Sequence, residues 1–259
     1  MFPLSDENPT LRTPIMTYAI LGGMVGSWVL LQGAGLDPER LITSVCNLGM
    51  VPGEITGRAR VGSGIPISPE ASCVVDTEAI NIFTPVISMF LHGGWGHLLG
   101  NAMFFWVFGN NVEDSMGRFR FLVFYLLCGL AAAAAHIFMD PTSPVPTVGA
   151  SGAISGILGA YILLYPRVLV RTLIPPFFIV NMRAWFMLGW WFLWQILGGL
   201  PQLTAVNPEV SGGVAFWAHV GGFVAGLLLI NLFVDRDIVR RRKAVASARE
   251  VWDPQYTRQ

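Results

Sequence analysis

Four polar side chains occur in apolar stretches of this sequence, at positions where they could act together on one substrate. Ser151 stands between glycines in the sequence Gly-Ala-Ser-Gly, and His219 stands within a long run of uncharged residues. His97 and Asn101 are four residues apart, so on a helix they lie on one face, one turn apart. Polar residues are energetically costly inside a membrane and are candidate functional residues there.

The chemistry that fits these residue types is acyl transfer with a serine nucleophile. A serine hydroxyl needs a base within hydrogen-bonding distance, and His219 is the deeply placed imidazole that could serve. A helix that starts at Ser151 would offer free N–H groups to an oxyanion, and His97 and Asn101 would add side-chain donors. No acidic residue falls in a predicted membrane span, so the pattern predicts a Ser-His dyad.

Each of these residues also has an ordinary structural explanation. A serine in a membrane helix commonly packs as a small residue, and a histidine or an asparagine can simply bridge two helices. His92 and His136 fall at span ends, where an interfacial imidazole requires no special role. The combination of a serine between glycines, a deep histidine and a His/Asn donor pair is what favours catalysis.

The composition indicates the environment that positions these residues. Of the 259 residues, 53% are hydrophobic and only 12% are charged, and the mean hydropathy is +0.57, which is typical of a membrane protein. The 16 basic and 16 acidic residues cancel, which argues against nucleic acid as a partner. The predicted partner is the lipid bilayer.

Uncharged stretches predict six membrane-spanning helices and therefore an all-α fold. A helix needs about 20 apolar residues to cross a hydrocarbon core about 30 Å thick. The stretch 79–112 is too long for one crossing and is interrupted by glycines, so we divide it into an interfacial segment, about 80–91, and a span, 94–112. The other predicted spans lie within 13–36, 121–139, 141–166, 184–208 and 210–234.

The distribution of arginine and lysine predicts how these spans are oriented. Six crossings place both termini on one side, and every basic residue except Arg40, Arg58 and Arg60 falls on that side. By the positive-inside rule, this side is the cytoplasm. The first apolar run has no small-residue cleavage pattern and is interpreted as a retained span of a cell-membrane protein, not as a signal peptide.

One membrane domain with two short flanking segments follows from this topology. Residues 1–13 form a cytoplasmic N-terminal segment, residues 14–234 form the six-helix domain, and residues 235–259 form a basic cytoplasmic tail. The tail is expected to set orientation and to contact anionic lipid. A long outer loop, about residues 34–79, is expected to pack on the helices or to lie in the interface.

The cysteines divide between this loop and the membrane. Cys46 and Cys73 fall in the outer loop, on the oxidising side, which favours a disulfide over two unrelated thiols. Cys128 falls in the third span, where a free thiol is usually just a small apolar residue.

Small residues on two predicted spans would let Ser151 and His219 approach each other. Such residues, spaced four apart, allow two helix backbones to come close in a membrane. They are Gly152, Ser155, Gly156 and Gly159 in the fourth span, and Gly222 and Gly226 in the sixth.

Three separated motifs, in the right order along the chain, resemble those of the rhomboid intramembrane serine proteases. They are His92-Gly-Gly-Trp-Gly-His97-Leu-Leu-Gly-Asn101 for the second span, Gly149-Ala-Ser151-Gly for the nucleophile, and Ala218-His219-Val-Gly-Gly for the base. Val112-Glu113-Asp-Ser-Met-Gly117 resembles the family's acidic-glycine turn. The resemblance covers about residues 80–234, which is five of the six spans.

This resemblance implies a hydrolase that cleaves transmembrane protein substrates near the outer membrane surface, without a metal or a cofactor. Ser151 is then the nucleophile and His219 the base, and His97, Asn101 and the Ser151 N–H are the oxyanion donors. The fifth span carries Trp185, Trp190, Trp191 and Trp194 and resembles the lateral gate for a substrate helix. An aromatic belt or a bulky lipid-facing surface is the alternative explanation.

The sequence also departs from the family pattern. Many relatives carry a tyrosine one turn after the nucleophile, on which the ring of the base packs, and this chain has Ser155 there. Another residue must then orient the ring. The Trp-Arg pair that marks the first outer loop in some members is also absent.

Two other functions fit parts of the pattern. A rhomboid-like protein that binds transmembrane clients without cutting them would be expected to lack the serine or the histidine, and both are present. A small transporter would also use intramembrane histidine and asparagine. The absence of an intramembrane carboxylate and of an internal repeat from the sequence argues against a transporter.

Overall fold

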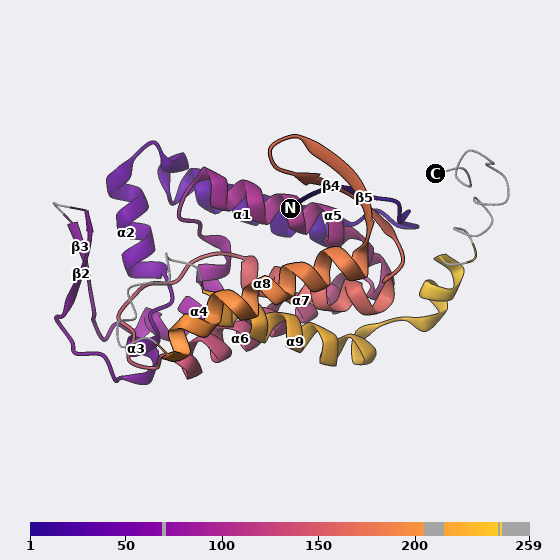
Figure 1. Cartoon of the computed structure of the whole chain (residues 1–259). Helices are drawn as coiled ribbons and strands as arrows, with labels where there is room; N and C mark the ends of the chain where they lie inside the picture. Colours follow the sequence, from indigo (N-terminus) through magenta and orange to yellow (C-terminus); the bar gives the residue numbers. More distant parts are fainter. Residues whose placement is uncertain (69–70, 205–214, 243, 245–259) are drawn as a thin grey trace.

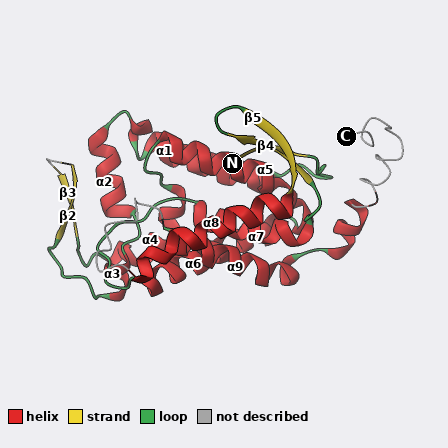
Figure 2. Cartoon of the chain, in the orientation of Figure 1, coloured by secondary structure: helices red, strands yellow, loops and turns green. Residues whose placement is uncertain are grey.

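The computed structural model describes residues 1–68, 71–204, 215–242 and 244, and this part of the chain is mostly helical (Figures 1 and 2). The long helices run roughly along one direction and form a bundle (Figure 1). They are α1 (Ile15–Leu30), α5 (Trp95–Met116), α6 (Arg118–Met139), α7 (Ser151–Leu164), α8 (Ala184–Thr204) and α9 (Phe216–Phe233).

Within the described residues, two of these helices, α6 and α9, are long and apolar enough to cross a membrane by length and composition. Helices α1 and α7 and the segment Ala79–Phe90 are apolar but shorter. Each stretch that the sequence predicts to cross the membrane overlaps one long helix. The number of crossings stays a prediction.

The expectation of an all-α fold is incomplete, because the described chain also contains short antiparallel strands. One sheet has the order β1-β4-β5, formed by β1 (Phe2–Asp6), β4 (Leu169–Ile174) and β5 (Phe178–Arg183). The other pairs β2 (Gly64–Ser68) with β3 (Ala71–Val74). These strands were not predicted because a short apolar run fits a strand or a buried helix equally well. The prolines at 175 and 176, between β4 and β5, prevent a helix from continuing through this segment.

The described residues of the long loop after α1 form short helices and strands that contact the bundle. It contains α2 (Pro38–Leu48) and α3 (Pro52–Thr56), followed by the β2–β3 hairpin. Its N–H at Gly53 donates to the Ser143 carbonyl at 2.8 Å, and Met50 bridges to Thr147, so it contacts the connection between α6 and α7. Further helical elements are the short 3-10 turns Gly33–Gly35, Ala79–Phe83 and Ser88–Phe90, the helix α4 (Thr84–Ile87) and a helical segment over residues 236–242.

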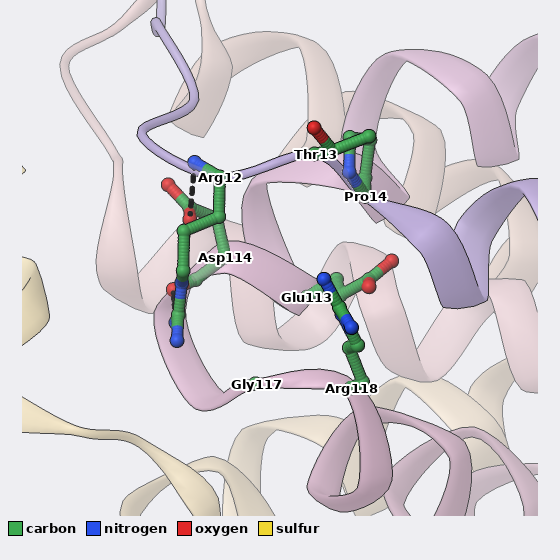
Figure 3. Close-up of a pocket in the computed structure, with 7 residues that line it drawn as sticks. All are labelled: Arg12, Thr13, Pro14, Glu113, Asp114, Gly117 and Arg118. Atoms are coloured by element: carbon green, nitrogen blue, oxygen red, sulfur yellow. Dashed lines mark hydrogen bonds and ion pairs between the residues drawn. The ribbon is translucent and has the colours of Figure 1, made fainter.

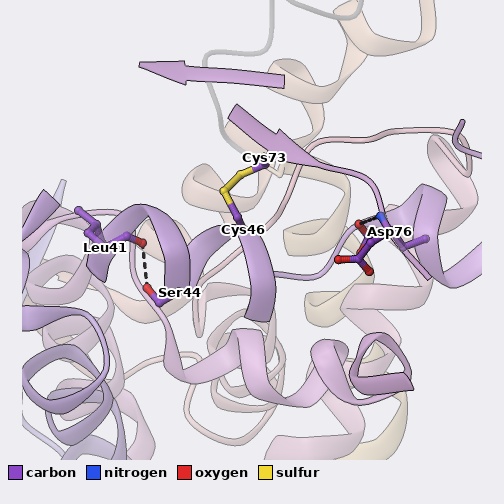
Figure 4. The surroundings of a disulfide bond; sticks show 6 residues. Leu41, Ser44, Cys46, Cys73 and Asp76 are labelled. Atoms are coloured by element: carbon purple, nitrogen blue, oxygen red, sulfur yellow. Dashed lines mark hydrogen bonds between the residues drawn. A yellow bond between two sulfur atoms is a disulfide. The ribbon is translucent and has the colours of Figure 1, made fainter. Parts of the chain in front are cut away.

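A disulfide joins two parts of this loop (Figure 4). Cys46 on α2 is bonded to Cys73 on β3, with Cα atoms 5.0 Å apart. Cys128 is free and buried on α6, as expected of a small apolar residue.

We expect removal of this bond to lower the stability of the outer loop. The two cysteines are 27 residues apart, and the chain-entropy estimate for a loop of that length is about 3–4 kcal/mol. The double change Cys46→Ser with Cys73→Ser should lower the melting temperature. Cys128→Ser is the control, because it removes a free thiol and leaves the disulfide of the loop intact. Mass spectrometry of unreduced protein tests the bond directly, and free thiols at both positions in protein from an oxidising compartment would contradict it.

Helices α7 and α9 touch backbone to backbone, as the small residues predict. A side chain added at Gly222 would overlap the Gly152 carbonyl, and one added at Gly226 would overlap the Gly156 carbonyl. A side chain at Gly159 would likewise collide with the Phe223 carbonyl. Glycine is therefore required along this contact because there is no space for a β-carbon.

Two acidic residues in the last turns of α5 hold the start of α1 (Figure 3). The Glu113 carboxylate accepts the N–H groups of Met16 and Thr17 at 3.0 and 2.7 Å, and so caps α1. The Asp114 carboxylate accepts the N–H of Leu11 at 2.8 Å and pairs with Arg12 at 3.3 Å. Together these contacts fasten the chain before α1 to the end of α5.

Arg242 is buried against the same acidic residues, although the sequence predicts that the basic tail contacts anionic lipid. Its guanidinium pairs with Asp114 at 3.3 Å and donates to the Tyr165 hydroxyl at 2.6 Å and the Asn111 carbonyl at 2.8 Å. It also donates to the Pro9 carbonyl at 2.9 Å. At least this residue of the predicted tail binds the helical bundle and not lipid.

We expect Arg242→Ala to destabilise the protein strongly. Removing one partner of a buried ion pair typically costs about 3–5 kcal/mol, and because Asp114 keeps its pair with Arg12 we expect a loss near the lower end of this range. Arg240→Ala is the matched control, because the Arg240 side chain is 77% exposed and a surface pair is worth at most about 1 kcal/mol. Melting temperatures of both variants in one detergent test this, and equal values would mean that Arg242 does not hold the tail to the bundle.

Candidate active site

Ser151 is the first residue of α7, and it follows a turn that requires glycine. Gly149 has φ +128°, a conformation that residues with a β-carbon rarely adopt. The first backbone hydrogen bond of α7 runs from the Ile154 N–H to the Ala150 carbonyl at 3.0 Å. The N–H groups before it are the free donors of a helix N-terminus, where a negative charge is stabilised.

Ser151 and His219 are brought together by the contact between α7 and α9. Ser151 Oγ and His219 Nε2 are 2.8 Å apart, which is hydrogen-bonding distance. The glycines of the two helices make this approach possible, since any side chain between the backbones would separate them. The structure therefore places the predicted nucleophile and the predicted base in direct contact.

The ring of His219 is held from the other side by α8. Its Nδ1 lies 2.7 Å from Oε1 of Gln195, and the ring centroids of His219 and Trp191 are 5.8 Å apart. An amide oxygen is only an acceptor, so Nδ1 carries the proton of the neutral ring and Nε2 is free to accept one from Ser151.

Ser155, which stands where many relatives have tyrosine, does not contact the base in this way. Its hydroxyl donates to the Ser151 carbonyl at 2.6 Å, within α7. Gln195 is the residue that the sequence analysis did not find. The signal was present, since Gln195 is the one strongly polar side chain between residues 184 and 200, in an otherwise apolar stretch.

His97 and Asn101 on α5 point their nitrogens at the turn before Ser151. A β-carbon built on Gly149 would lie 2.6 Å from His97 Nε2 and 3.6 Å from Asn101 Nδ2. His97 Nδ1 accepts the Gly93 N–H at 3.3 Å, which leaves Nε2 of the neutral ring as a donor. Asn101 Nδ2 is buried and has no hydrogen-bond acceptor among the described residues. Two donors thus lie beside the start of α7, and the one on Asn101 has no acceptor in the described part of the chain.

The remaining histidines have different surroundings. His92 is fully buried within the protein, and its ring lies edge-on to His97 with centroids 5.2 Å apart. The Gln32 side chain, just after α1, hydrogen-bonds both backbone groups of His92 at 2.7 and 2.8 Å and so fixes this segment. His136 pairs with Thr147 at 3.1 Å.

Comparison with known proteins gives the family. The family model described as the Rhomboid domain matches residues 77–236 of this chain. The chain belongs to the rhomboid family. Rhomboid proteins are membrane-embedded, so the apolar helices of the bundle are those of a membrane protein.

Named rhomboid relatives come from several organisms. Rhomboid protease GluP of Bacillus subtilis is 32% identical over 174 residues, which is 60% of this chain and 33% of that protein. Rhomboid protease AarA of Providencia stuartii is 29% identical over 162 residues, covering 57% of this chain and 54% of that protein. Rhomboid-like protein 11 of Arabidopsis thaliana is 26% identical over 156 residues, covering 57% and 51%. The chain thus spans between a third and about half of the length of these rhomboid relatives.

We expect Asn101→Ala to separate a catalytic role from a packing role. If Asn101 donates to an oxyanion, its loss should lower kcat about 10²–10³-fold and leave KM little changed, because that bond forms in the transition state. The measurement is kcat, KM and melting temperature in one detergent, with Asn110→Ala, near the far end of the same helix, as the control. A destabilised Asn101→Ala protein with native kcat per folded molecule would make Asn101 a packing residue.

Proposed function

We propose that this rhomboid protein is an intramembrane serine endopeptidase in which Ser151 is the nucleophile and His219 is the base. The observation that carries the proposal is the 2.8 Å contact between Ser151 Oγ and His219 Nε2, across two helices that touch through glycines. The relatives named as proteases support it. The proposed reaction uses no metal and no cofactor.

The proposed chemistry follows from the positions of these groups. Ser151 Oγ attacks the scissile carbonyl carbon while its proton passes to His219 Nε2. The negative charge on the carbonyl oxygen is stabilised by His97 Nε2, Asn101 Nδ2 and the Ser151 N–H. His219 then gives its proton to the leaving amine, and water, activated by the same imidazole, hydrolyses the acyl-enzyme.

We propose the topology predicted by the sequence for the same protein. Six helices cross the cell membrane, both termini are cytoplasmic, and the site opens toward the outer face. The domain would comprise residues 14–234, flanked by the segments 1–13 and 235–259. Ser151 begins α7 at the end of the bundle that also carries the disulfide-bonded loop, which fits an oxidising outer side.

The proposed substrates are transmembrane proteins that are cut near the outer membrane surface. A substrate helix is expected to approach beside α8, whose tryptophans include Trp185 and Trp194, each more than half exposed. The competing function is a rhomboid-like protein that binds transmembrane clients without cutting them. Such a protein has no need for a serine and a histidine in hydrogen-bonding contact.

We expect a fluorophosphonate probe to label the purified protein at Ser151. Ser151→Ala should abolish both labelling and substrate cleavage, and His219→Ala should do the same within the detection limit, because the pair acts as a unit. Ser155→Ala is the matched control: it removes a neighbouring hydroxyl of the same helix, and labelling should persist.

Folding of each variant is checked by its melting temperature in the same detergent. Folded protein that neither reacts with the probe nor cuts any transmembrane substrate would favour the client-binding function. Near-native turnover by Ser151→Ala or His219→Ala would refute the dyad.

A further inference from the structure

We infer that Gln195 is a positioning residue, which holds His219 in the tautomer that can accept the proton of Ser151. This inference rests on the proposed function. It converts the predicted dyad into a chain of three side chains from three helices, α7, α9 and α8.

The orientation of the Gln195 amide is fixed by its second partner. Its Nε2 donates to the Trp191 carbonyl at 3.3 Å, one helical turn earlier, and its Oε1 faces His219 Nδ1 at 2.7 Å. A flipped amide would place two acceptors, Oε1 and the Trp191 oxygen, against each other. The oxygen therefore faces the ring, and the Gln195 side chain is buried, so water does not compete for this bond.

The group that accepts the hydrogen bond from His219 Nδ1 is an uncharged amide and not a carboxylate. The titratable side chains that act on His219 are His97 on α5 and His136 on α6. The sequence of α8 contains no acidic or basic residue. From α7, the side chain that contacts the His219 ring is the hydroxyl of Ser151. The amide thus supplies the acceptor that a carboxylate supplies in a Ser-His-Asp triad.

Two substitutions at this position separate positioning from packing. Gln195→Leu keeps similar bulk but removes the acceptor, and we expect kcat to fall about tenfold with KM little changed, the effect of losing about one hydrogen bond. Gln195→Glu keeps an acceptor, so kcat at alkaline pH should recover. On acidification, kcat of Gln195→Glu should begin to fall at a higher pH than kcat of the native protein, because a carboxylate stabilises the protonated imidazole.

A readout that needs no activity completes the test. In ¹⁵N-histidine NMR spectra of the full chain, the neutral His219 ring should carry its proton on Nδ1, and Gln195→Leu should move population to the Nε2-protonated form. An unchanged tautomer, or native kcat in Gln195→Leu, would overturn the inference. Absence of probe labelling in the native protein would instead refute the proposed function, while the spectra still decide the role of Gln195.

A second inference comes from a different part of the chain, the β4–β5 hairpin. We propose that its tip inserts into the lipid leaflet at the end of the bundle where α7 ends and α8 begins. Residues 173–180 form an uninterrupted apolar run, and the side chains of Phe177, Phe178 and Ile179 are 87%, 67% and 50% exposed. In Figure 1 the hairpin arches away from the helices.

The charges of the hairpin favour lipid over a protein partner. Arg171 and Arg183 are exposed and lie near each other, away from the tip. In the β4–β5 ladder, Arg171 stands opposite Asn181, and Arg183 stands opposite Leu169. At about 3.4 Å per residue, Phe178 is about 17 Å from Arg183 along the strand, which is about the depth of one hydrocarbon leaflet. Arginines at the headgroups with an apolar tip in the acyl region match this geometry.

The hairpin also continues a surface that faces lipid. Trp185 and Phe186, the first exposed residues of α8 after Arg183, are 51% and 47% exposed, as in an interfacial aromatic belt. An apolar tip and a free strand edge of this kind would promote aggregation in water, whereas a leaflet covers both.

A fluorescent label tests where the tip lies. The full chain with Cys128→Ala and Phe177→Cys is labelled with NBD under non-reducing conditions and placed in vesicles that contain anionic lipid. The controls are Leu228→Cys, at a 71% exposed position of α9, and Arg240→Cys, at a 77% exposed position. Phe177→Cys should be blue-shifted and quenched by doxyl lipids like Leu228→Cys. Two results would overturn the proposal. One is quenching of the Phe177→Cys label by aqueous iodide, as expected for Arg240→Cys. The other is a label that neither iodide nor doxyl lipids quench, as expected if it is buried in protein.

Discussion

The backbone contact between α7 and α9 is the constraint on which the rest of the site depends. A membrane offers little hydrophobic driving force between helices, so their association depends on close packing of small residues. Gly222 and Gly226 lie against the carbonyls of Gly152 and Gly156, where any side chain would force the helices apart. The 2.8 Å distance between Ser151 and His219 is a consequence of this packing. Local geometry at the serine alone would not produce it.

A third helix completes the site from the side opposite the nucleophile. α8 brings Gln195 and Trp191 to the ring of His219, while α5 brings His97 and Asn101 to the start of α7. The serine, its base, the Gln195 acceptor and the donors His97 and Asn101 thus come from four helices. Their relative positions depend on the bundle as a whole, including the polar contacts at its other end.

The sequence could predict the elements of the site but not all of its contacts. Polar residues in uncharged runs identified Ser151, His219 and the α5 pair, and the spacing of small residues indicated which helices touch. Gln195 was missed because one amide among aromatic residues does not reveal which way its helix is rotated. Arg242 was missed for a related reason: a run of basic residues is usually solvated, and only the tertiary fold shows that one of them enters the bundle. The strand pairing of residues 169–183 was ambiguous because short apolar runs fit helix or strand.

The two ends of the bundle use different polar chemistry, and the cost of burying charge explains the difference. At the end near Asp114, full charges are paired with each other and with several hydrogen-bond donors, so the desolvation penalty is offset. At the Ser151 end, the groups around His219 are a hydroxyl, an amide and other imidazoles, none of which is obligatorily charged. An unpaired carboxylate within a membrane would cost several kcal/mol before substrate arrives. A neutral glutamine can fix the tautomer of the base without that cost, and this makes an amide the physically reasonable third partner for a serine and a histidine inside the bilayer.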